Sequence, residues 1–117
     1  MRYIESYVHL NKIGVLVEFD IPDLITLGSE EFQQLARDIA MHIAAANPTG
    51  IDANSMFNVI PVQFREGQTG ISAEALLEQA WIKDPGIRIG DLIDRVSRDL
   101  RAAIRVTRFA RYSVDDI

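Results

Sequence analysis

The sequence predicts a single α+β domain in which a small antiparallel sheet of about three strands is covered by two amphipathic helices. Three observations support this fold class. Two hydrophobic strand-like runs lie close together near the N-terminus, two helical stripes of apolar residues follow, and a third strand-like run lies near the C-terminus. The length of 117 residues fits one domain over positions 1–117.

The first two runs predict an antiparallel hairpin. Arg2 to Leu10 is rich in Tyr, Ile and Val, which suit a pleated surface. Ile13 to Phe19 is almost continuously apolar, which favours a central strand covered on both faces. The gap between them is only Asn11 and Lys12, short enough for a hairpin turn.

A long helix is predicted from Ser29 to Ala46. Apolar residues recur at i, i+3, i+4, i+7, i+11 and i+14 and form one stripe: Phe32, Leu35, Ala36, Ile39, Ile43 and Ala46. Ser29 suits the N-cap position, and Asn47 before Pro48 ends the helix. We expect the preceding segment from Asp20 to Gly28 to be a loop, because it contains Pro22 and Gly28.

The C-terminal part predicts a second helix and a last strand. The same spacing of apolar residues runs from Ile89 to Ala103, and a strand-like run follows from Ile104 to Tyr112. Its alternation changes parity between Val106 and Phe109, which a bulge near Thr107 would reconcile. We expect this strand to pair with the hairpin, because a lone hairpin is marginal in water.

The middle of the chain gives weaker signals. Val59 to Phe64 predicts a short strand, which Pro61 would confine to an edge. Glu66 to Gly70 is typical of a turn, and Ser72 is a candidate cap for a short helix that ends at Glu78. After Trp81 and Ile82, the run from Lys83 to Gly86 is a strong turn signal.

The composition excludes several classes of function. The chain has no cysteine, so a disulfide framework, a thiolate zinc site and a cysteine nucleophile are excluded. The net charge of −5 argues against general nucleic-acid binding. No apolar run approaches the roughly 18–20 residues that cross a bilayer, and the N-terminus lacks a signal-peptide pattern. We therefore expect a cytoplasmic protein without a membrane contact.

The residues that could carry chemistry form no enzyme signature. There is no Gly-x-Ser-x-Gly elbow and no phosphate-binding Gly-rich loop, so we expect neither catalysis nor a cofactor. His42, at the rim of the first helical stripe, is interpreted as a packed, hydrogen-bonded residue. His9, beside the hairpin turn, is either a surface residue or a partner contact. The carboxylate pair Asp115 and Asp116 is no metal site by itself.

Four arginines near the C-terminus allow two interpretations: Arg101, Arg105, Arg108 and Arg111. They could form a nucleic-acid stripe, since Phe109 and Tyr112 lie among them. They could instead form a solvated edge that balances the 17 acidic residues. We favour the solvated edge.

Five segments resemble the core of the elongation factor Ts family, and they occur in the family's order: Glu5–His9, Ile13–Glu18, Phe32–Pro48, Leu76–Pro85 and Val106–Tyr112. The most specific string is Ala-Met-His-Ile-Ala-Ala within the long helix, and the segments cover roughly two-thirds of the chain. The resemblance implies a dimerisation-type α+β domain that binds elongation factor Tu and promotes release of its GDP. Such exchange needs no covalent chemistry, because it rests on differential affinity.

The chain departs from the family pattern in three places. Family members begin with a small helical domain, whereas this chain starts at the first strand, so we expect that partner contact to be absent. The family's Cys-Glu-Thr-Asp-Phe-Val motif corresponds to Ile21–Thr26, which puts Leu24 and Ile25 at the Asp-Phe positions. A one-residue shift would instead offer Asp23–Leu24. The family's long helical insertion is shortened here to Thr49–Ala75.

The resemblance implies these partner-binding residues: His9, Asp23, Leu24, Ile25 and Leu100. One hypothesis is an elongation factor Ts-like protein that binds elongation factor Tu and promotes GDP release. A second is a divergent paralogue that has lost exchange and serves as a protein-binding and dimerisation module, and a third is an unrelated activity such as RNA binding. We also expect a homodimer, because a symmetric dimer would cover the edges of the small sheet.

Overall fold

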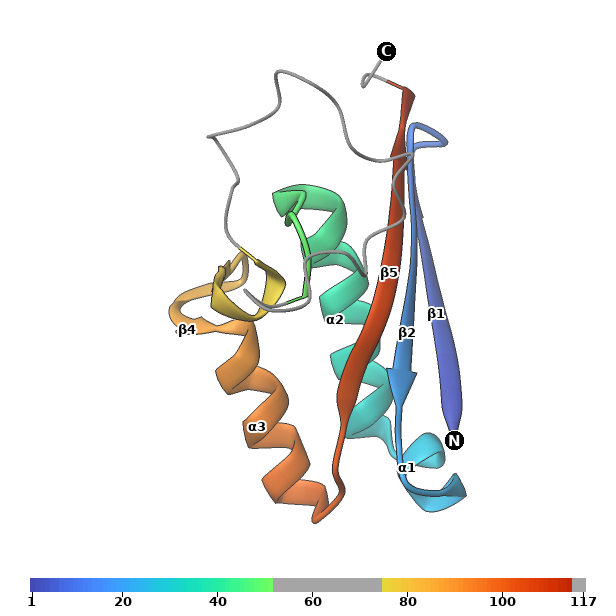
Figure 1. The fold of residues 1–117 in the computed structure, drawn as a ribbon, viewed down its shortest axis with the longest axis vertical. Helices are drawn as coiled ribbons and strands as arrows, with labels where there is room; N and C mark the ends of the chain where they lie inside the picture. The colour runs from blue at the N-terminus through green and yellow to red at the C-terminus, as the bar shows by residue number, and fades with distance from the viewer. Residues whose placement is uncertain (52–74, 115–117) are drawn as a thin grey trace.

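The computed structural model describes residues 1–51 and 75–114 and shows one three-stranded antiparallel sheet with helices on one side (Figure 1). The strands are β1 (Arg2–His9), β2 (Ile13–Asp20) and β5 (Arg105–Ser113), in the spatial order β1-β2-β5. The predicted α+β class, the hairpin and the pairing of the last strand with it are confirmed. The expectations for Val59–Phe64, Glu66–Gly70, Ser72 and the Asp115–Asp116 pair lie outside the described residues.

The hairpin is closed by a tight turn. β1 and β2 pair from Arg2 opposite Asp20 to His9 opposite Ile13. Leu10 and Asn11 both have positive φ, 54° and 58°, and the Lys12 amide donates to the His9 carbonyl at 2.9 Å. Positive φ at both central residues matches the right-handed twist of the flanking strands. Leu10 thus holds an unfavourable backbone conformation for a leucine and projects its side chain into solvent.

The predicted bulge at Thr107 is confirmed. β5 pairs with β2 so that Val106 lies opposite Phe19 and Arg108 opposite Glu18, which leaves Thr107 as the extra residue. The Thr107 hydroxyl lies 2.7 Å from Glu18 Oε1 and 3.2 Å from the Glu18 carbonyl oxygen. The bulge therefore restores the alternation of β5 and gives the extra residue a hydrogen-bond partner.

The expectation that β2 is covered on both faces is wrong. β2 is the central strand, but only its inward side chains are buried, namely Val15, Val17 and Phe19. Leu16, between them, is 51% exposed. Since the strand is flanked by hydrogen-bonded neighbours and covered by helices on one side alone, its outward residues face solvent (Figure 1).

The long helix α2 (Glu30–Ala46) covers the inner face of the sheet, as predicted. The Ser29 hydroxyl accepts from the Phe32 amide at 3.3 Å, and Asn47 ends the helix with a φ of 48°. Phe32 packs edge-on against both Phe19 and Tyr3, with ring centroids 5.5 Å apart in each pair. These contacts join α2 to β1 and β2 around one core.

The second helix, α3 (Ile89–Leu100), packs beside α2 and is shorter than predicted. Arg101 adopts a φ of 52°, and the Ala102 amide donates to the Ser97 carbonyl at 3.0 Å. This left-handed C-terminal cap stops the helix before Ala103, although the apolar spacing continues. Apolar spacing alone does not mark the end of a helix, because a capping residue can turn the chain within the pattern.

The segment before α3 contains a two-stranded hairpin that the sequence did not predict. The short 3₁₀ helix η3 (Leu76–Glu78) confirms a helical turn ending at Glu78, and β3 (Ala80–Trp81) then pairs with β4 (Asp84–Arg88). Ile82 and Lys83 make the turn, so most of the predicted turn from Lys83 to Gly86 lies in β4. No helix within the described residues is long and apolar enough to cross a membrane.

His42 ties this small hairpin to α2. Its ring is fully buried; Nδ1 accepts from the Ile82 amide at 3.3 Å, so Nε2 carries the proton and donates to Gln79 Oε1 at 2.8 Å. Lys83 on the same turn pairs with Asp38 of α2 at 2.6 Å. The interpretation of His42 as a packed, hydrogen-bonded residue is confirmed. Burial lowers the pKa of His42, against the opposing effect of its bond to Gln79.

This pKa predicts that the folded state loses stability in mild acid. Below about pH 6.5 the unfolded chain takes up a proton on His42 more readily than the folded chain does, so the free energy of unfolding falls as the pH drops. We expect urea midpoints to decrease from pH 7.5 to pH 5. His42→Gln should flatten this decrease, whereas His9→Gln, which alters the other, exposed histidine, should leave it unchanged. Equal slopes for the two variants would contradict this role of His42.

Candidate functional site

The segment between β2 and α2 is not the loop that the sequence predicted from Asp20 to Gly28. It contains a one-turn helix, α1 (Leu24–Gly28). Asp23 is its N-cap: Asp23 Oδ1 accepts from the Thr26 amide at 2.9 Å and from the Thr26 hydroxyl at 2.8 Å. Pro22 precedes the turn of helix and Gly28 is its last residue, so neither interrupts it, and the Asp23 cap stabilises its start.

Leu24 and Ile25, here called the α1 tip, project from this helix into solvent. Leu24 is 69% exposed and Ile25 is 85% exposed, the highest value among the large hydrophobic residues described. The residues on either side of them are buried, Ile21 before the α1 tip and Thr26 directly after it. The molecule therefore holds two large apolar side chains away from its own core on an anchored base.

The base of the α1 tip is tied to its surroundings by hydrogen bonds. The Ile21 amide donates to the Met1 carbonyl at 2.9 Å, which extends the β1–β2 pairing up to the start of the segment. At the other side, Gln33 Nε2 donates to the Leu27 carbonyl at 3.0 Å and the Ser29 amide donates to the Thr26 carbonyl at 3.1 Å. The last carbonyls of α1 thus have partners from α2 and its cap.

The C-terminal end of α3, whose last residue is Leu100, lies at the same end of the molecule as α1 (Figure 1). The side chain of Leu100 is half-buried and packs against the core. The carboxyl group of its neighbour Asp99 lies beside that of Glu31 in the first turn of α2, so the end of α3 lies beside the start of α2. This contact raises the pKa of Glu31, because two carboxyl groups that share a proton cannot both ionise without repulsion.

His9 lies at the opposite end of the sheet. It is exposed, its Nδ1 lies 3.0 Å from the Tyr7 hydroxyl, and the two rings are stacked. The length of β1, about 23 Å at the usual rise per residue, separates this end from the one where α1 begins. The predicted site residues therefore form two groups: Asp23, Leu24, Ile25 and Leu100 at one end, and His9 at the other.

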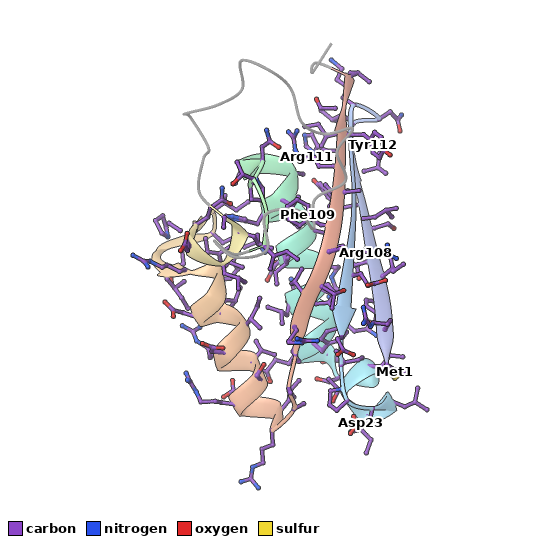
Figure 2. All side chains as sticks on the ribbon, viewed as in Figure 1. Met1, Asp23, Arg108, Phe109, Arg111 and Tyr112 are labelled. Carbon is purple, nitrogen blue, oxygen red and sulfur yellow. The ribbon has the colours of Figure 1, made fainter. Side chains whose placement is uncertain are left out.

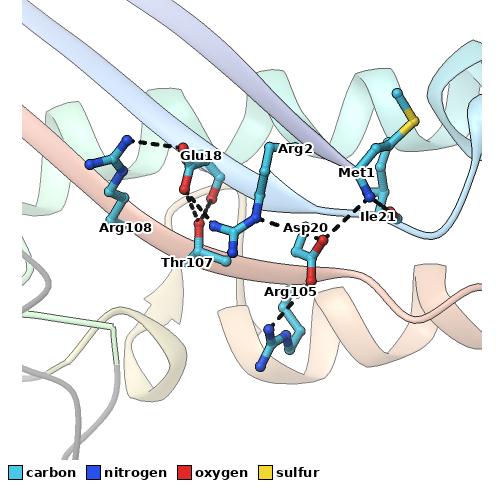
Figure 3. Close-up of polar contacts among 8 residues, drawn as sticks. All are labelled: Met1, Arg2, Glu18, Asp20, Ile21, Arg105, Thr107 and Arg108. Atoms are coloured by element: carbon cyan, nitrogen blue, oxygen red, sulfur yellow. Dashed lines mark hydrogen bonds and ion pairs between the residues drawn. The ribbon is translucent and has the colours of Figure 1, made fainter.

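Charged side chains bridge the three strands near α1 (Figure 3). Glu18 on the central strand pairs with Arg2 of β1 at 2.8 Å and with Arg108 of β5 at 3.2 Å. Asp20 pairs with Arg105 at 3.4 Å. The hydrogen bond from Thr107, followed by those from the arginines, holds the pKa of Glu18 below its usual range despite its burial.

These ion pairs decide between the two interpretations of the C-terminal arginines. Arg105 and Arg108 are exposed and pair with acidic residues of β2, which confirms the solvated edge for them. For Arg111 the expectation is wrong. Its guanidinium is buried, with Nε and Nη2 donating to the Ala44 carbonyl near the end of α2 at 3.2 Å and 3.0 Å. A cation there also complements the helix dipole.

The sequence interpretation missed an apolar outer face of the sheet, defined by Ile4, Val8, Leu16 and Tyr112. Figure 2 shows Phe109 and Arg111 on the helix side of β5, with Arg108 and Tyr112 on the other side. Val8, Gly14 and Tyr112 lie side by side across the three strands, and Leu16 belongs to the next row. The sequence held a signal for this face, because Ile4 and Val8 of β1 are an even number of residues apart and so lie on the same side of the strand.

The described residues contain no group of three or more histidine, aspartate or glutamate side chains that could hold a metal ion. The geometry offers instead two apolar surfaces, the α1 tip and the outer face, on a scaffold fixed by a packed core and by interstrand ion pairs. Exposed apolar side chains such as these gain free energy when a partner removes them from water.

Comparison with known proteins identifies the class. The family model described as elongation factor TS matches residues 1–68. Elongation factor Ts of Thermodesulfovibrio yellowstonii is 35% identical over 134 residues, which cover 95% of this chain and 67% of the relative. That of Frankia casuarinae is 31% identical, with 95% and 69% covered, and that of Desulfosudis oleivorans is 28% identical, with 97% and 69% covered.

The chain belongs to the elongation factor Ts family. Membership confirms the resemblance carried by the five segments and supports an elongation factor Ts-like role in translation elongation. It also places the chain in a family of exchange factors, which are not enzymes in the usual sense.

The Glu31–Asp99 contact predicts a stabilising substitution. The raised pKa of Glu31 means that this contact stabilises the fold when protonated and loses that contribution as the pH rises through the folded-state pKa. Glu31→Gln should therefore raise the melting temperature at pH 7 but not at pH 3.5. Glu30→Gln removes a charge from the same helical turn without this contact and controls for the helix dipole. If Glu31→Gln raised the melting temperature at pH 7 no more than Glu30→Gln does, repulsion between Glu31 and Asp99 would be contradicted.

Proposed function

We propose that this protein binds elongation factor Tu and promotes the release of its GDP. The observation that carries the proposal is the α1 tip. In the ungapped alignment Leu24 and Ile25 take the places of the family's Asp-Phe pair, and they are 69% and 85% exposed. An aliphatic side chain in that place offers a partner the apolar contact of the family's phenylalanine without its ring.

The exposure of the α1 tip has no explanation in the fold itself. Neither Leu24 nor Ile25 belongs to the core or to the residues that pack against it. Removing such a side chain from water is worth about 1.5–3 kcal/mol, so leaving two of them in solvent forgoes substantial stabilisation. A partner that covers them recovers this free energy on binding, which supports a role of the tip in recognition.

Exchange activity follows if the tip binds one state of the partner better than another. A factor that prefers nucleotide-free elongation factor Tu lowers the affinity of that protein for GDP by the same factor, because the two binding equilibria are linked. Insertion of apolar side chains near a nucleotide site would act in this way without any bond being made or broken. The rigid base of α1 supports such a role, since a mobile tip would lose more entropy on binding.

Leu100 and His9 extend the proposed contact. Leu100 lies at the end of the molecule that carries the α1 tip, and it would enlarge the same contact. His9 lies at the other end of the sheet, so a single partner would have to span the length of β1 to reach both. Elongation factor Tu is then expected to lie along the molecule rather than against one end of it.

The test is the release of labelled GDP from elongation factor Tu, with this protein in excess. We expect acceleration by the wild-type chain and a loss of about ten-fold in apparent affinity for Ile25→Ala, the size expected from truncating one buried aliphatic side chain. Ile25→Phe, which restores the family's ring, should increase the acceleration.

Ile82→Ala serves as the matched control for this experiment. It also truncates an exposed aliphatic residue, but on the β3–β4 turn, away from α1. The absence of any acceleration by the wild-type chain would reject the exchange function. Binding without acceleration, scored by pull-down, would favour the divergent paralogue, and loss of activity in Ile82→Ala would show that the α1 tip has no special part.

We also propose that the protein forms a homodimer through the outer face of its sheet. Ile4, Val8, Leu16 and Tyr112 are all more than half exposed and lie on one face of three paired strands, Val8, Leu16 and Tyr112 in adjacent rows and Ile4 beside Glu18. Gly14 leaves open space between Val8 and Tyr112, because a Cβ at that position would meet nothing within 4 Å. Two such faces can stack as the sheets of a sandwich do, each filling the space that the other leaves.

Light scattering tests this second proposal. The wild-type chain should have the mass of a dimer, and Leu16→Asp, which puts a charge at the centre of the outer face, should have the mass of a monomer. Ile82→Asp adds the same charge elsewhere and should stay dimeric. A monomeric wild-type mass at working concentration would reject the dimer.

A further inference from the structure

We propose that Asp23 is a positioning residue for partner binding: its carboxylate holds α1 in the helical turn that presents Leu24 and Ile25, and it makes no contact with the partner. The inference rests on the proposed binding of elongation factor Tu through the α1 tip. It decides between the two alignments left open by the sequence, one of which offers Asp23 itself as the acidic contact.

One oxygen of the Asp23 carboxylate is already engaged within the chain. The same oxygen, Oδ1, accepts two hydrogen bonds from Thr26, one from the amide at 2.9 Å and one from the hydroxyl at 2.8 Å. Asp23 has extended backbone geometry, with φ −163° and ψ 174°, as an N-cap residue requires. A partner that took this oxygen would have to break both bonds.

α1 depends on this cap more than a longer helix would. A helix of five residues is far below the length at which helices are stable by themselves, because nucleation fixes several backbone angles for very few hydrogen bonds. One backbone hydrogen bond links α1 to its cap residue: the Leu27 amide donates to the Asp23 carbonyl at 3.2 Å. The side chain of Asp23 adds two hydrogen bonds to this backbone bond at the start of α1.

The cap also sets the direction of the α1 tip. Thr26, the residue that Asp23 binds, is buried, so the bond ties the cap to a fixed point of the core. Residues Leu24 and Ile25 lie between these two anchors and are left on the outer side of the turn. If the cap were lost, the same two side chains would sample many directions, and only a fraction of the molecules would present them correctly.

This arrangement predicts which substitutions of Asp23 matter. Asp23→Ala removes the cap and should weaken binding to elongation factor Tu about five-fold, the equilibrium effect of losing one helix N-cap. Asp23→Asn and Asp23→Ser keep a capping oxygen but remove the charge, and both should bind like the wild-type chain. All three substitutions fall on an exposed residue outside the core, so the fold should persist.

A double-mutant cycle tests whether Asp23 acts through the α1 tip. In the background of Leu24→Ala with Ile25→Ala, the further change Asp23→Ala should have no effect on binding, because there is nothing left to position. The amide of Thr26 reports the cap directly. Its hydrogen exchange in the free chain should accelerate in Asp23→Ala and remain slow in Asp23→Asn.

The outcomes separate the two proposals. The positioning role would be overturned, and direct contact favoured, if Asp23→Asn lost as much affinity as Asp23→Ala. The same conclusion would follow if Asp23→Ala lost as much affinity in the Leu24→Ala, Ile25→Ala background as in the wild-type chain. Unchanged exchange of the Thr26 amide in Asp23→Ala would overturn it as well. If the wild-type chain does not bind elongation factor Tu at all, the proposed function itself fails, and the positioning role fails with it.

Discussion

The packing of β2 against α2 is the contact on which the rest of this structure depends. β2 is hydrogen-bonded on both sides, and its inward side chains meet the apolar stripe of α2, with Phe19 against Phe32 at the centre. The two elements are consecutive apart from one short connection. Once they are packed, both ends of that connection are held in place, since Ile21 is buried at one end and Thr26 at the other. The middle of the connection lies outside the core, where it forms the α1 tip.

Interstrand ion pairs make the base of that connection rigid. Glu18 and Asp20 lie on the central strand and attract arginines from both neighbouring strands (Figure 3). Exposed pairs of this kind each contribute little stability, generally below about 1 kcal/mol. Their combined effect is to align three strands at the end where β2 leads into α1. The α1 tip therefore adjoins an end of the sheet where ion pairs link the strands, and in the proposed function this limits the entropy that a partner must remove.

The two apolar surfaces suggest a division of tasks within a small domain. The α1 tip is narrow and projects from one end, which suits insertion into a partner. The outer face extends over three strands, and Gly14 leaves a gap in it between Val8 and Tyr112. Association through the face would leave the tip accessible, because the tip lies beyond the end of the sheet (Figure 1). The proposed dimer and the proposed exchange activity are therefore compatible in one molecule.

The sequence by itself determined the elements whose signals are local and periodic. Alternation of apolar residues and the spacing of the α2 stripe predicted three strands and two helices, and the parity change between Val106 and Phe109 even located the bulge at Thr107. Tertiary structure decided what depends on contacts between distant segments. The left-handed cap at Arg101 ends α3 before the apolar spacing stops. The bonds of His42 to Gln79 and Ile82 hold the β3–β4 hairpin, whose short sequence shows almost no apolar alternation. The candidate site divides in the same way. Family resemblance pointed to Asp23, Leu24 and Ile25, but only the structure showed that one of them is a helix cap and the other two are exposed, because exposure is set by how neighbouring elements pack and not by residue type.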